Sequence, residues 1–153
     1  MAKITADLIR DVRESTGAPI LKTKKVLEEV NGNREKAVKI LRKEGFEKAS
    51  KRAERATAQG IVTTYTHHNG KVASIIELLC ETDFVAKNDV FQKLANEIAM
   101  QTASMNPKNE KELLRQDFIK DPSRKIEELV KEVITKTGEN IKVGRIARIA
   151  VGE

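Results

Sequence analysis

The chain has 153 residues, of which 39% are apolar and 34% are charged. This composition is typical of a globular protein with a highly charged surface and argues against a disordered chain, and the length allows one medium domain or a small domain joined to a larger one. The net charge of +6 suits an anionic partner, either nucleic acid or an acidic protein surface, but aromatic residues reach only 3%, which leaves little material for stacking on bases.

The sequence gives two indications about the compartment. No apolar run approaches the roughly 20 residues that cross a bilayer, and the first residues lack the basic-then-apolar pattern of a secretory signal, so we expect a cytoplasmic protein. Cys80 is the only cysteine, which excludes an internal disulfide and a multi-cysteine metal site. Because it ends an apolar strand, we interpret it as a small buried residue rather than a reactive thiol.

The first two predicted elements are short helices. Residues 5–15 form the first, with Thr5 as its cap, and the Gly-Ala-Pro sequence at residues 17–19 ends it. The second helix follows at once and carries its apolar residues at helical spacing. It ends at the Asn-Gly-Asn sequence of residues 31–33, whose residue types tolerate a left-handed backbone.

A third helix is predicted from Asn33 to Gly45, and it completes a three-helix bundle over residues 1–45. This arrangement resembles a helix-turn-helix, so DNA binding is an alternative at this point. A recognition helix carries basic and amide side chains near its start. The third helix offers Asn33, Arg34, Lys36 and Lys39.

Residues 46–59 carry basic side chains among alanines. This pattern is typical of a solvated helix that connects two packed units, with a nucleic-acid arm as the alternative. Beyond it, residues 61–66 and 72–79 predict a β-hairpin, and the Asn-Gly pair at residues 69 and 70 predicts a two-residue turn.

Two histidines, His67 and His68, lie at the tip of this hairpin. Neighbours in a strand point to opposite faces, and no acidic or cysteine residue lies close by in sequence, so we expect no metal site. The second strand is apolar at consecutive positions, which predicts that both of its faces are covered. Helices of the same chain can cover one face, and another subunit can cover the other.

The remainder predicts two longer helices and a third strand. Residues 88–104 form one helix, a short helical piece follows within residues 108–121, and Ser123 caps another helix that ends at Gly138. Residues 141–151 suit the third strand, with Arg145 and Arg148 on opposite faces at its rim. The fold class is therefore α+β: after the bundle, residues 60–153 form a three-stranded antiparallel sheet packed with helices, and pairing with a second copy would protect its open face and edges.

Between the second strand and the next helix lies a charged corner. Thr82 or Asp83 can cap the helix by accepting a free backbone N–H group. Capping does not explain Phe84, whose ring either lies under its own helix or faces a partner. Because aromatic side chains are more often buried, the residue types alone favour the covered position.

The amino-acid sequence around this corner resembles a known signature. Residues 77–87, Glu-Leu-Leu-Cys-Glu-Thr-Asp-Phe-Val-Ala-Lys, closely resemble the signature of bacterial elongation factor Ts, the nucleotide exchange factor for elongation factor Tu. Residues 12–18, Val-Arg-Glu-Ser-Thr-Gly-Ala, and Lys-Lys-Val-Leu at residues 24–27 resemble the amino-terminal signature of the same family. The two signatures follow the family's order and spacing, and the resemblance covers essentially the whole chain.

The resemblance implies two partner-binding regions. The amino-terminal bundle would be of the ubiquitin-associated type and would dock on the nucleotide-binding domain of elongation factor Tu, through Pro19, Ile20, Leu21 and Lys24. A second group would push into that domain near its Mg²⁺ site, with Phe84 as a wedge and Asp83 disturbing the network around the metal: Thr82, Asp83, Phe84 and Val85. Two positions depart from the family, since Lys22 replaces an acidic residue and Leu79 replaces Asn.

The resemblance also implies a guanine nucleotide exchange factor that is not an enzyme, and single-core members of the family are homodimers. The residues agree with a protein that is not an enzyme, because the sequence offers no Gly-rich phosphate loop, no nucleophile beside a base and no metal-ligand spacing. We therefore expect no cofactor and no bound metal. The alternative is a basic RNA- or ribosome-binding protein without exchange activity, which the net charge and the bundle support.

Overall fold

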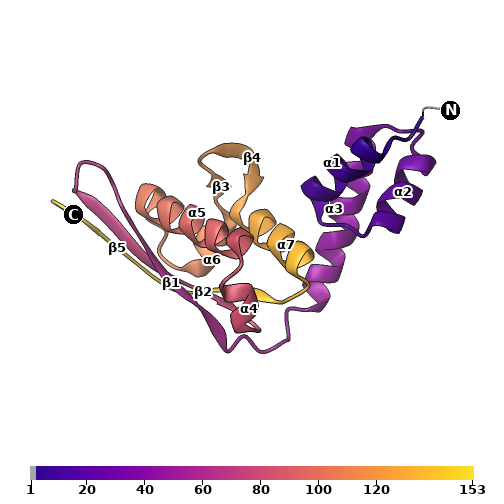
Figure 1. The fold of residues 1–153 in the computed structure, drawn as a ribbon. Helices are drawn as coiled ribbons and strands as arrows, with labels where there is room; N and C mark the ends of the chain where they lie inside the picture. Colours follow the sequence, from indigo (N-terminus) through magenta and orange to yellow (C-terminus); the bar gives the residue numbers. More distant parts are fainter. Residues whose placement is uncertain (1–2) are drawn as a thin grey trace.

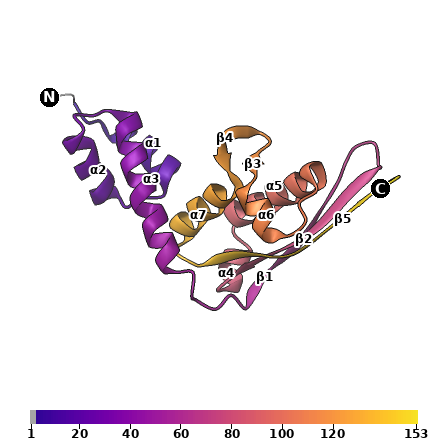
Figure 2. The same ribbon diagram turned by 180° about the vertical axis from the view of Figure 1, so that it is seen from behind.

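The computed structural model describes residues 3–153, so the first two residues of the predicted 1–45 bundle lie outside the described residues. Three helices form one end of the molecule: α1 (Ala6–Thr16), α2 (Ile20–Glu29) and α3 (Arg34–Lys51). A sheet covered by helices forms the other end (Figures 1 and 2). The bundle has its own small apolar core, made of Val12, Ala18, Val26, Leu27, Ala37 and Leu41.

The ends of the first two helices confirm the predicted signals. The Thr5 hydroxyl accepts the backbone N–H of Leu8 at 3.2 Å, as a helix cap does. Gly17 ends α1 with a φ of +69°, a left-handed conformation that glycine adopts without a steric penalty. Asn31 and Gly32, also with positive φ, follow the end of α2.

The predicted end of the third helix at Gly45 is wrong, because α3 continues to Lys51. Gly45 instead allows a close helix crossing: a Cβ atom there would lie 2.9 Å from Cγ2 of Thr135 in α7 (Ile126–Thr137). One turn further on, Ala49 is buried and belongs to the core of the sheet end. The predicted connector therefore begins as a packed helix, while the division into segments 1–45, 46–59 and 60–153 stays a prediction.

The main sheet has three antiparallel strands in the order β1-β2-β5, as predicted. They are β1 (Gln59–Thr66), β2 (Val72–Cys80) and β5 (Ile141–Ala150). The predicted two-residue turn between the first two is wrong, because His67 closes the hairpin by donating its N–H to the Val72 carbonyl at 2.8 Å. A two-residue turn of the Asn-Gly kind needs positive φ at both residues, and of that pair only Gly70 has it.

Helices α5 (Asp89–Met105), α6 (Glu110–Arg115) and α7 lie on one side of this sheet (Figures 1 and 2). Asn88 caps α5 at its start and Asn106 ends it, as the predicted bounds required. The prediction that Ser123 caps the last helix is wrong. Ser123 lies in β4 (Asp121–Lys125), which pairs with β3 (Asp117–Phe118), and α7 begins one residue after β4. Gly138 ends α7 as predicted.

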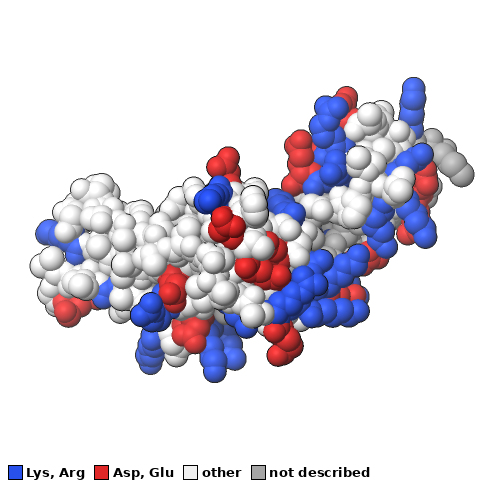
Figure 3. All heavy atoms as spheres, turned by 60° about the horizontal axis from the view of Figure 1, so that its bottom comes forward, with Lys and Arg blue, Asp and Glu red and all other residues white. Residues whose placement is uncertain are grey.

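Within the single chain, only one face of the sheet is covered. Side chains that face the helices are buried, among them Ile76, Leu78 and Cys80 of β2. On the opposite face Val62 is 62% exposed, Ile75 46% and Ile149 79%. Figure 3 turns the underside forward, and white atoms predominate over this part of the molecule. Within residues 3–153 no element covers the second face, so the prediction that both faces are covered stays a prediction that needs a second subunit.

A β-bulge interrupts β5 on the open face, where the register shifts opposite Glu77. The Glu77 carboxylate accepts from the Arg145 guanidinium and from the Arg145 backbone N–H, both at 3.2 Å. Gly144 leaves room for this carboxylate, since a Cβ there would lie 2.3 Å from Oε1 of Glu77. The Arg145 guanidinium, with its backbone N–H, holds the pKa of Glu77 below its ordinary value of 4.5.

Arg148 lies on the other face of β5, as predicted, but it is not a rim residue. Its side chain is only 14% exposed, and its Nε donates to the Ala103 carbonyl of α5 at 2.8 Å. The arginine therefore fastens β5 to the covering helix. Across the residues that the structure describes, no helix is both long enough and apolar enough to span a membrane.

We predict that Gly45→Leu lowers the free energy of unfolding by about 1–3 kcal/mol, the usual cost of overpacking. Leucine is a good helix former, so the loss reports the crossing with α7 rather than a weaker helix. Urea denaturation measures it. Thr135→Ala in the same background should restore part of the loss, because Thr135 supplies the atoms in the way; an unchanged midpoint in the single variant would contradict the close crossing.

We also predict that Glu77→Gln weakens the pH dependence of the unfolding free energy at acidic pH. The folded pKa of Glu77 lies below the unfolded one, so its charge stabilises the fold above about pH 4.5 and this contribution is lost as the pH falls through the folded pKa. The unfolding free energy of the variant should therefore fall less steeply below pH 4.5 than that of the wild type at equal protein concentration. Equal slopes would mean that the ion pair contributes nothing.

Candidate partner-binding site

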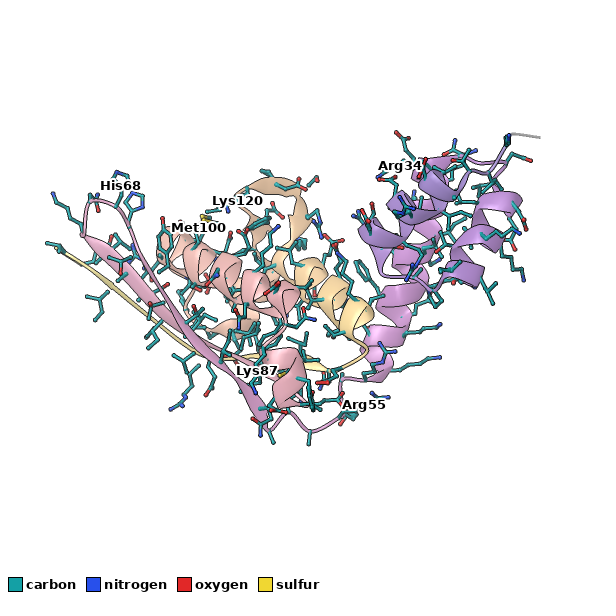
Figure 4. All side chains as sticks on the ribbon, in the orientation of Figure 1. Arg34, Arg55, His68, Lys87, Met100 and Lys120 are labelled. Atoms are coloured by element: carbon teal, nitrogen blue, oxygen red, sulfur yellow. The ribbon has the colours of Figure 1, made fainter. Side chains whose placement is uncertain are left out.

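The chain turns from β2 into the one-turn helix α4 (Asp83–Ala86), and we call residues 82–85 the 82–85 corner. Thr82 is the N-cap of α4, because its hydroxyl accepts the Val85 N–H at 3.4 Å. The prediction that Thr82 or Asp83 caps the long helix after the corner is wrong, because α4 is a separate turn and Asn88 caps α5. Figure 1 places α4 beside the connection from α3 to β1. Figure 4 labels Lys87 and Arg55 on the two sides of this junction.

Phe84 points away from the protein and is 82% exposed, so the covered position that residue types favoured is wrong. The physical reason is that other residues of the same turn take the inward positions. Ala86 is buried, and Val85 packs against the core of the sheet end. Asp83 also faces outward, and its carboxylate lies 3.3 Å from the Lys87 ammonium. Thus Asp83 and Phe84 are the side chains of the corner that face outward.

Thr82 is held by hydrogen bonds to Glu139, which lies two residues after the end of α7. Its backbone N–H donates to Oε1 of Glu139 at 2.8 Å, and its hydroxyl donates to Oε2 at 2.7 Å. Sequence reasoning missed Glu139, which lies 57 residues away along the chain. The residue types alone carry no signal for this pairing, because a glutamate after a helix-ending glycine has many ordinary uses.

Cys80 lies under the same corner and is fully buried, as predicted. Its Sγ donates to the Thr82 carbonyl at 3.1 Å. Burial raises the pKa of the Cys80 thiol, and the negative charges of Glu139 and Asp83 add to the shift. The thiol therefore stays protonated and acts as a packing group.

The second predicted region is the start of α2. Pro19 is the N-cap residue, Ile20 is 53% exposed and Leu21 82%. Lys24 is exposed one turn further on. These four residues form one exposed turn of the bundle, which we call the 19–24 edge. The structure does not bring this edge and the 82–85 corner together, because α3 separates them (Figures 1 and 2).

Lys22, where the family signature has an acidic residue, has a partner within the bundle. Its Nζ lies 2.8 Å from a carboxylate oxygen of Glu44 in α3. The hydrogen bond to Glu44 raises the pKa of Lys22. The basic residue at this position is therefore matched by an acidic one in the chain, and it does not disturb the exposed apolar pair beside it.

The basic residues that suggested DNA recognition are divided in their roles. Arg34 is bound to Asp11 of α1 and to the Ser15 hydroxyl, and its guanidinium lowers the pKa of Asp11. Lys36 and Lys39 are exposed. Three other basic residues, Lys48, Lys51 and Arg55, are exposed at or just beyond the end of α3.

The two histidines lie in the hairpin turn rather than in a strand. Their rings are 4.2 Å apart, so the prediction that they point to opposite faces is wrong. The hydroxyl of Tyr65 lies 3.1 Å from Nδ1 of His67. Within residues 3–153, no group of three or more His, Cys, Asp or Glu side chains is placed to hold a metal ion.

Comparison with known proteins agrees with the signatures. Elongation factor Ts of Thermotoga maritima is 40% identical, with 99% of this chain and 98% of the relative aligned. The elongation factor Ts of Finegoldia magna is 40% identical, with 100% of this chain and 92% of the relative aligned. That of Thermosipho melanesiensis is 38% identical, with 98% of this chain and 100% of the relative aligned. These alignments run over 194 to 206 positions, so the relatives carry segments that this chain of 153 residues lacks.

A family profile described as elongation factor TS matches residues 81–153, a stretch that contains the 82–85 corner, α5, α7 and β5. The full-length relatives extend the match to the bundle and the first hairpin. Both comparisons name the family that the two signatures indicated. The chain belongs to the elongation factor Ts family.

Proposed function

We propose that this chain is a guanine nucleotide exchange factor that promotes the release of GDP from elongation factor Tu during translation elongation in the cytoplasm. Family membership supports the role and the partner. The observation that carries the proposal is Phe84, a large aromatic side chain held 82% exposed on a one-turn helix. An exposed ring on a fixed support is the kind of residue that dominates protein interfaces.

The proposed mechanism acts on the phosphate and metal site of the partner. A GTPase holds its nucleotide through a phosphate cradle and a bound Mg²⁺, so an exchange factor must bind the nucleotide-free state more tightly than the loaded one. Phe84 would wedge into the nucleotide-binding domain. Asp83 would hydrogen bond near the metal network, since its ion pair with Lys87 is exposed and therefore weak.

Thr82 and Val85 have supporting roles in this proposal. Both hydrogen-bond donors of Thr82 are already used by Glu139, and Val85 packs partly inward. These two residues therefore fix the shape of the corner, while Phe84 and Asp83 reach the partner.

The 19–24 edge would supply a second contact on the nucleotide-binding domain. Ile20 and Leu21 offer exposed apolar area there, and Pro19 and Lys24 flank them. Two contacts on one rigid molecule make the second binding step intramolecular, which raises the effective concentration of the corner at its target. In this division of roles, the edge contributes affinity and the corner contributes nucleotide release.

We also propose that the open face of the sheet binds a second copy of the chain. Exposed apolar residues lie on all three strands of that face: Val62 on β1, Ile75 on β2 and Ile149 on β5. A two-fold related copy would cover them and shield the outer strands. Single-core members of the family, which this chain resembles, are homodimers.

The test of function is release of fluorescent GDP from elongation factor Tu of the same source, with Mg²⁺ and this protein at sub-stoichiometric amounts. Acceleration with turnover supports exchange. No acceleration by the folded protein, together with RNA binding that falls steeply with salt, would favour the alternative of a basic RNA- or ribosome-binding protein.

We predict that Phe84→Ala slows catalysed GDP release about 30-fold or more, as expected for an interface residue worth about 2 kcal/mol. The side chain is exposed, so the thermal midpoint should not change. Val151→Ala is the matched control, because Val151 is 76% exposed and directly follows β5, whose last residue pairs with Val72 at the end of β2 away from the corner. Wild-type rates in Phe84→Ala would reject the wedge.

We predict that Val62→Lys converts a dimer into a monomer. The substitution places a charge on the open face, halfway along the edge strand β1, where burial against a second copy would desolvate it. Light scattering after size exclusion gives the mass, and Val90→Lys on α5, which is 39% exposed, is the control. A wild type of monomer mass, or a Val62→Lys variant of dimer mass, would reject this interface.

A further inference from the structure

We infer that Glu139 and Asn140 are positioning residues for the 82–85 corner: they fix the direction of Phe84 and tie the corner to the segment that leaves the bundle. The inference rests on the proposed function, and it extends that function to two residues that do not reach the partner. Its basis is the set of hydrogen bonds around a single turn between α7 and β5.

The turn begins at Gly138, which ends α7 with a φ of +77°. This left-handed residue reverses the backbone, so the side chain of Glu139 reaches the end of β2. There the two carboxylate oxygens accept both donors of Thr82, at 2.8 and 2.7 Å. Hydrogen bonds to a carboxylate are shorter and about twice as strong as those between neutral groups.

The hydrogen bonds to Glu139 determine how the Thr82 hydroxyl is oriented. A hydroxyl can donate one hydrogen bond, and here the Thr82 hydroxyl donates it to Glu139. The lone pairs of the oxygen are then left for the Val85 N–H, which is the capping bond of α4. Glu139 thus selects the side-chain rotamer of Thr82 that starts the helix.

Such support matters because α4 has only four residues. Helices shorter than about 12 residues are marginal in water, so a single turn needs outside contacts to keep its shape. Phe84 cannot supply them, because its ring is 82% exposed. The direction of the ring depends on the Thr82 cap and on the inward packing of Val85 and Ala86.

Asn140 extends the same turn toward the bundle. Its side chain is almost fully buried, and its Nδ2 donates to the carbonyls of Ala53 at 3.3 Å and Arg55 at 2.8 Å. Its backbone N–H donates to Glu81 at 2.7 Å, and Glu81 also pairs with Arg55. The segment that follows α3 and the residue before Thr82 are therefore fastened to one point, beside the Arg55 label in Figure 4.

A purely structural role makes a different prediction from a positioning role. Glu139 is partly exposed, so its truncation lets water reach the Thr82 donors and leaves the fold intact. If Glu139 only stabilised the fold, activity would follow the folded fraction. If it positions Phe84, the folded variant loses exchange activity, because misplacing an interacting group by about 1 Å can cost 100-fold.

The experiment compares Glu139→Ala with the wild type in three measurements. We expect kcat/KM for GDP release from elongation factor Tu to fall about tenfold or more, the range seen when supporting residues of a site are removed. The thermal midpoint should change little. Amide hydrogen exchange, measured by NMR on the protein alone, should become faster at Thr82 and Val85.

Two further variants separate positioning from general damage. Glu139→Gln keeps one acceptor for Thr82, so its exchange rate should lie between those of the wild type and Glu139→Ala. In a Thr82→Val background, which lacks the hydroxyl, Glu139→Ala should cost less than in the wild type, because the two residues act through one contact. Glu110→Ala in α6 is the control and should keep the wild-type rate.

Each result decides the inference. A wild-type exchange rate in Glu139→Ala, or unchanged amide exchange at Thr82, would overturn it. A loss of activity that parallels a loss of folded protein would assign Glu139 a structural role only. If the wild type itself fails to accelerate GDP release, the proposed function is rejected, and the amide exchange of the free protein still decides whether Glu139 orders the corner.

Discussion

The close crossing of α3 and α7 at Gly45 is the constraint on which the rest of the molecule depends. The bundle has only six buried apolar residues in its own core, which is little for an independent unit. Its last helix compensates by running on into the second core, where Ala49 is buried. A Cβ at Gly45 would lie 2.9 Å from Cγ2 of Thr135, so a larger residue there would force Thr135 to shift or the two helices to separate. The crossing sets how far the 19–24 edge lies from the 82–85 corner, and the proposed partner would have to match that separation to contact both.

The corner shows how a protein can keep an apolar ring in water. Exposing Phe84 forfeits the free energy that burial would give, so neighbouring contacts must hold the turn without its help. Inward packing of Ala86 and the charge-assisted hydrogen bonds that Thr82 donates to Glu139 meet this need. The stabilising groups and the exposed group are therefore different residues. This separation allows the exposed surface to match a partner while the supporting residues match the fold.

Much of this architecture could be predicted from local patterns, and the misses have a shared physical cause. Strand alternation, the Thr5 cap and the glycines that end α1 and α7 are local signals, and the structure confirms them. Gly45 was misread because glycine both ends helices and allows close approach, and only the position of Thr135 decides between the two. Phe84 and Glu139 needed the same kind of knowledge, since burial and a contact 57 residues away depend on the folded arrangement. The family signature indicated a partner-binding role for Phe84 without information on the folded arrangement, whereas it indicated nothing about Glu139.

The place of β5 in the sheet has a consequence for synthesis. The central strand β2 pairs with β1 through a short hairpin. Its other edge pairs with β5, which begins some sixty residues after β2 ends and is therefore synthesised much later. The contacts inside the bundle are close in sequence, so its helices can begin to pack while the ribosome is still adding residues, and the crossing of α3 with α7 forms later. The sheet closes only when β5 arrives, and the Asn140 bonds that fasten the corner form with it. The helices that carry the 19–24 edge can therefore take shape before the 82–85 corner is fixed, and a truncated product without β5 would lack the contacts that hold the corner.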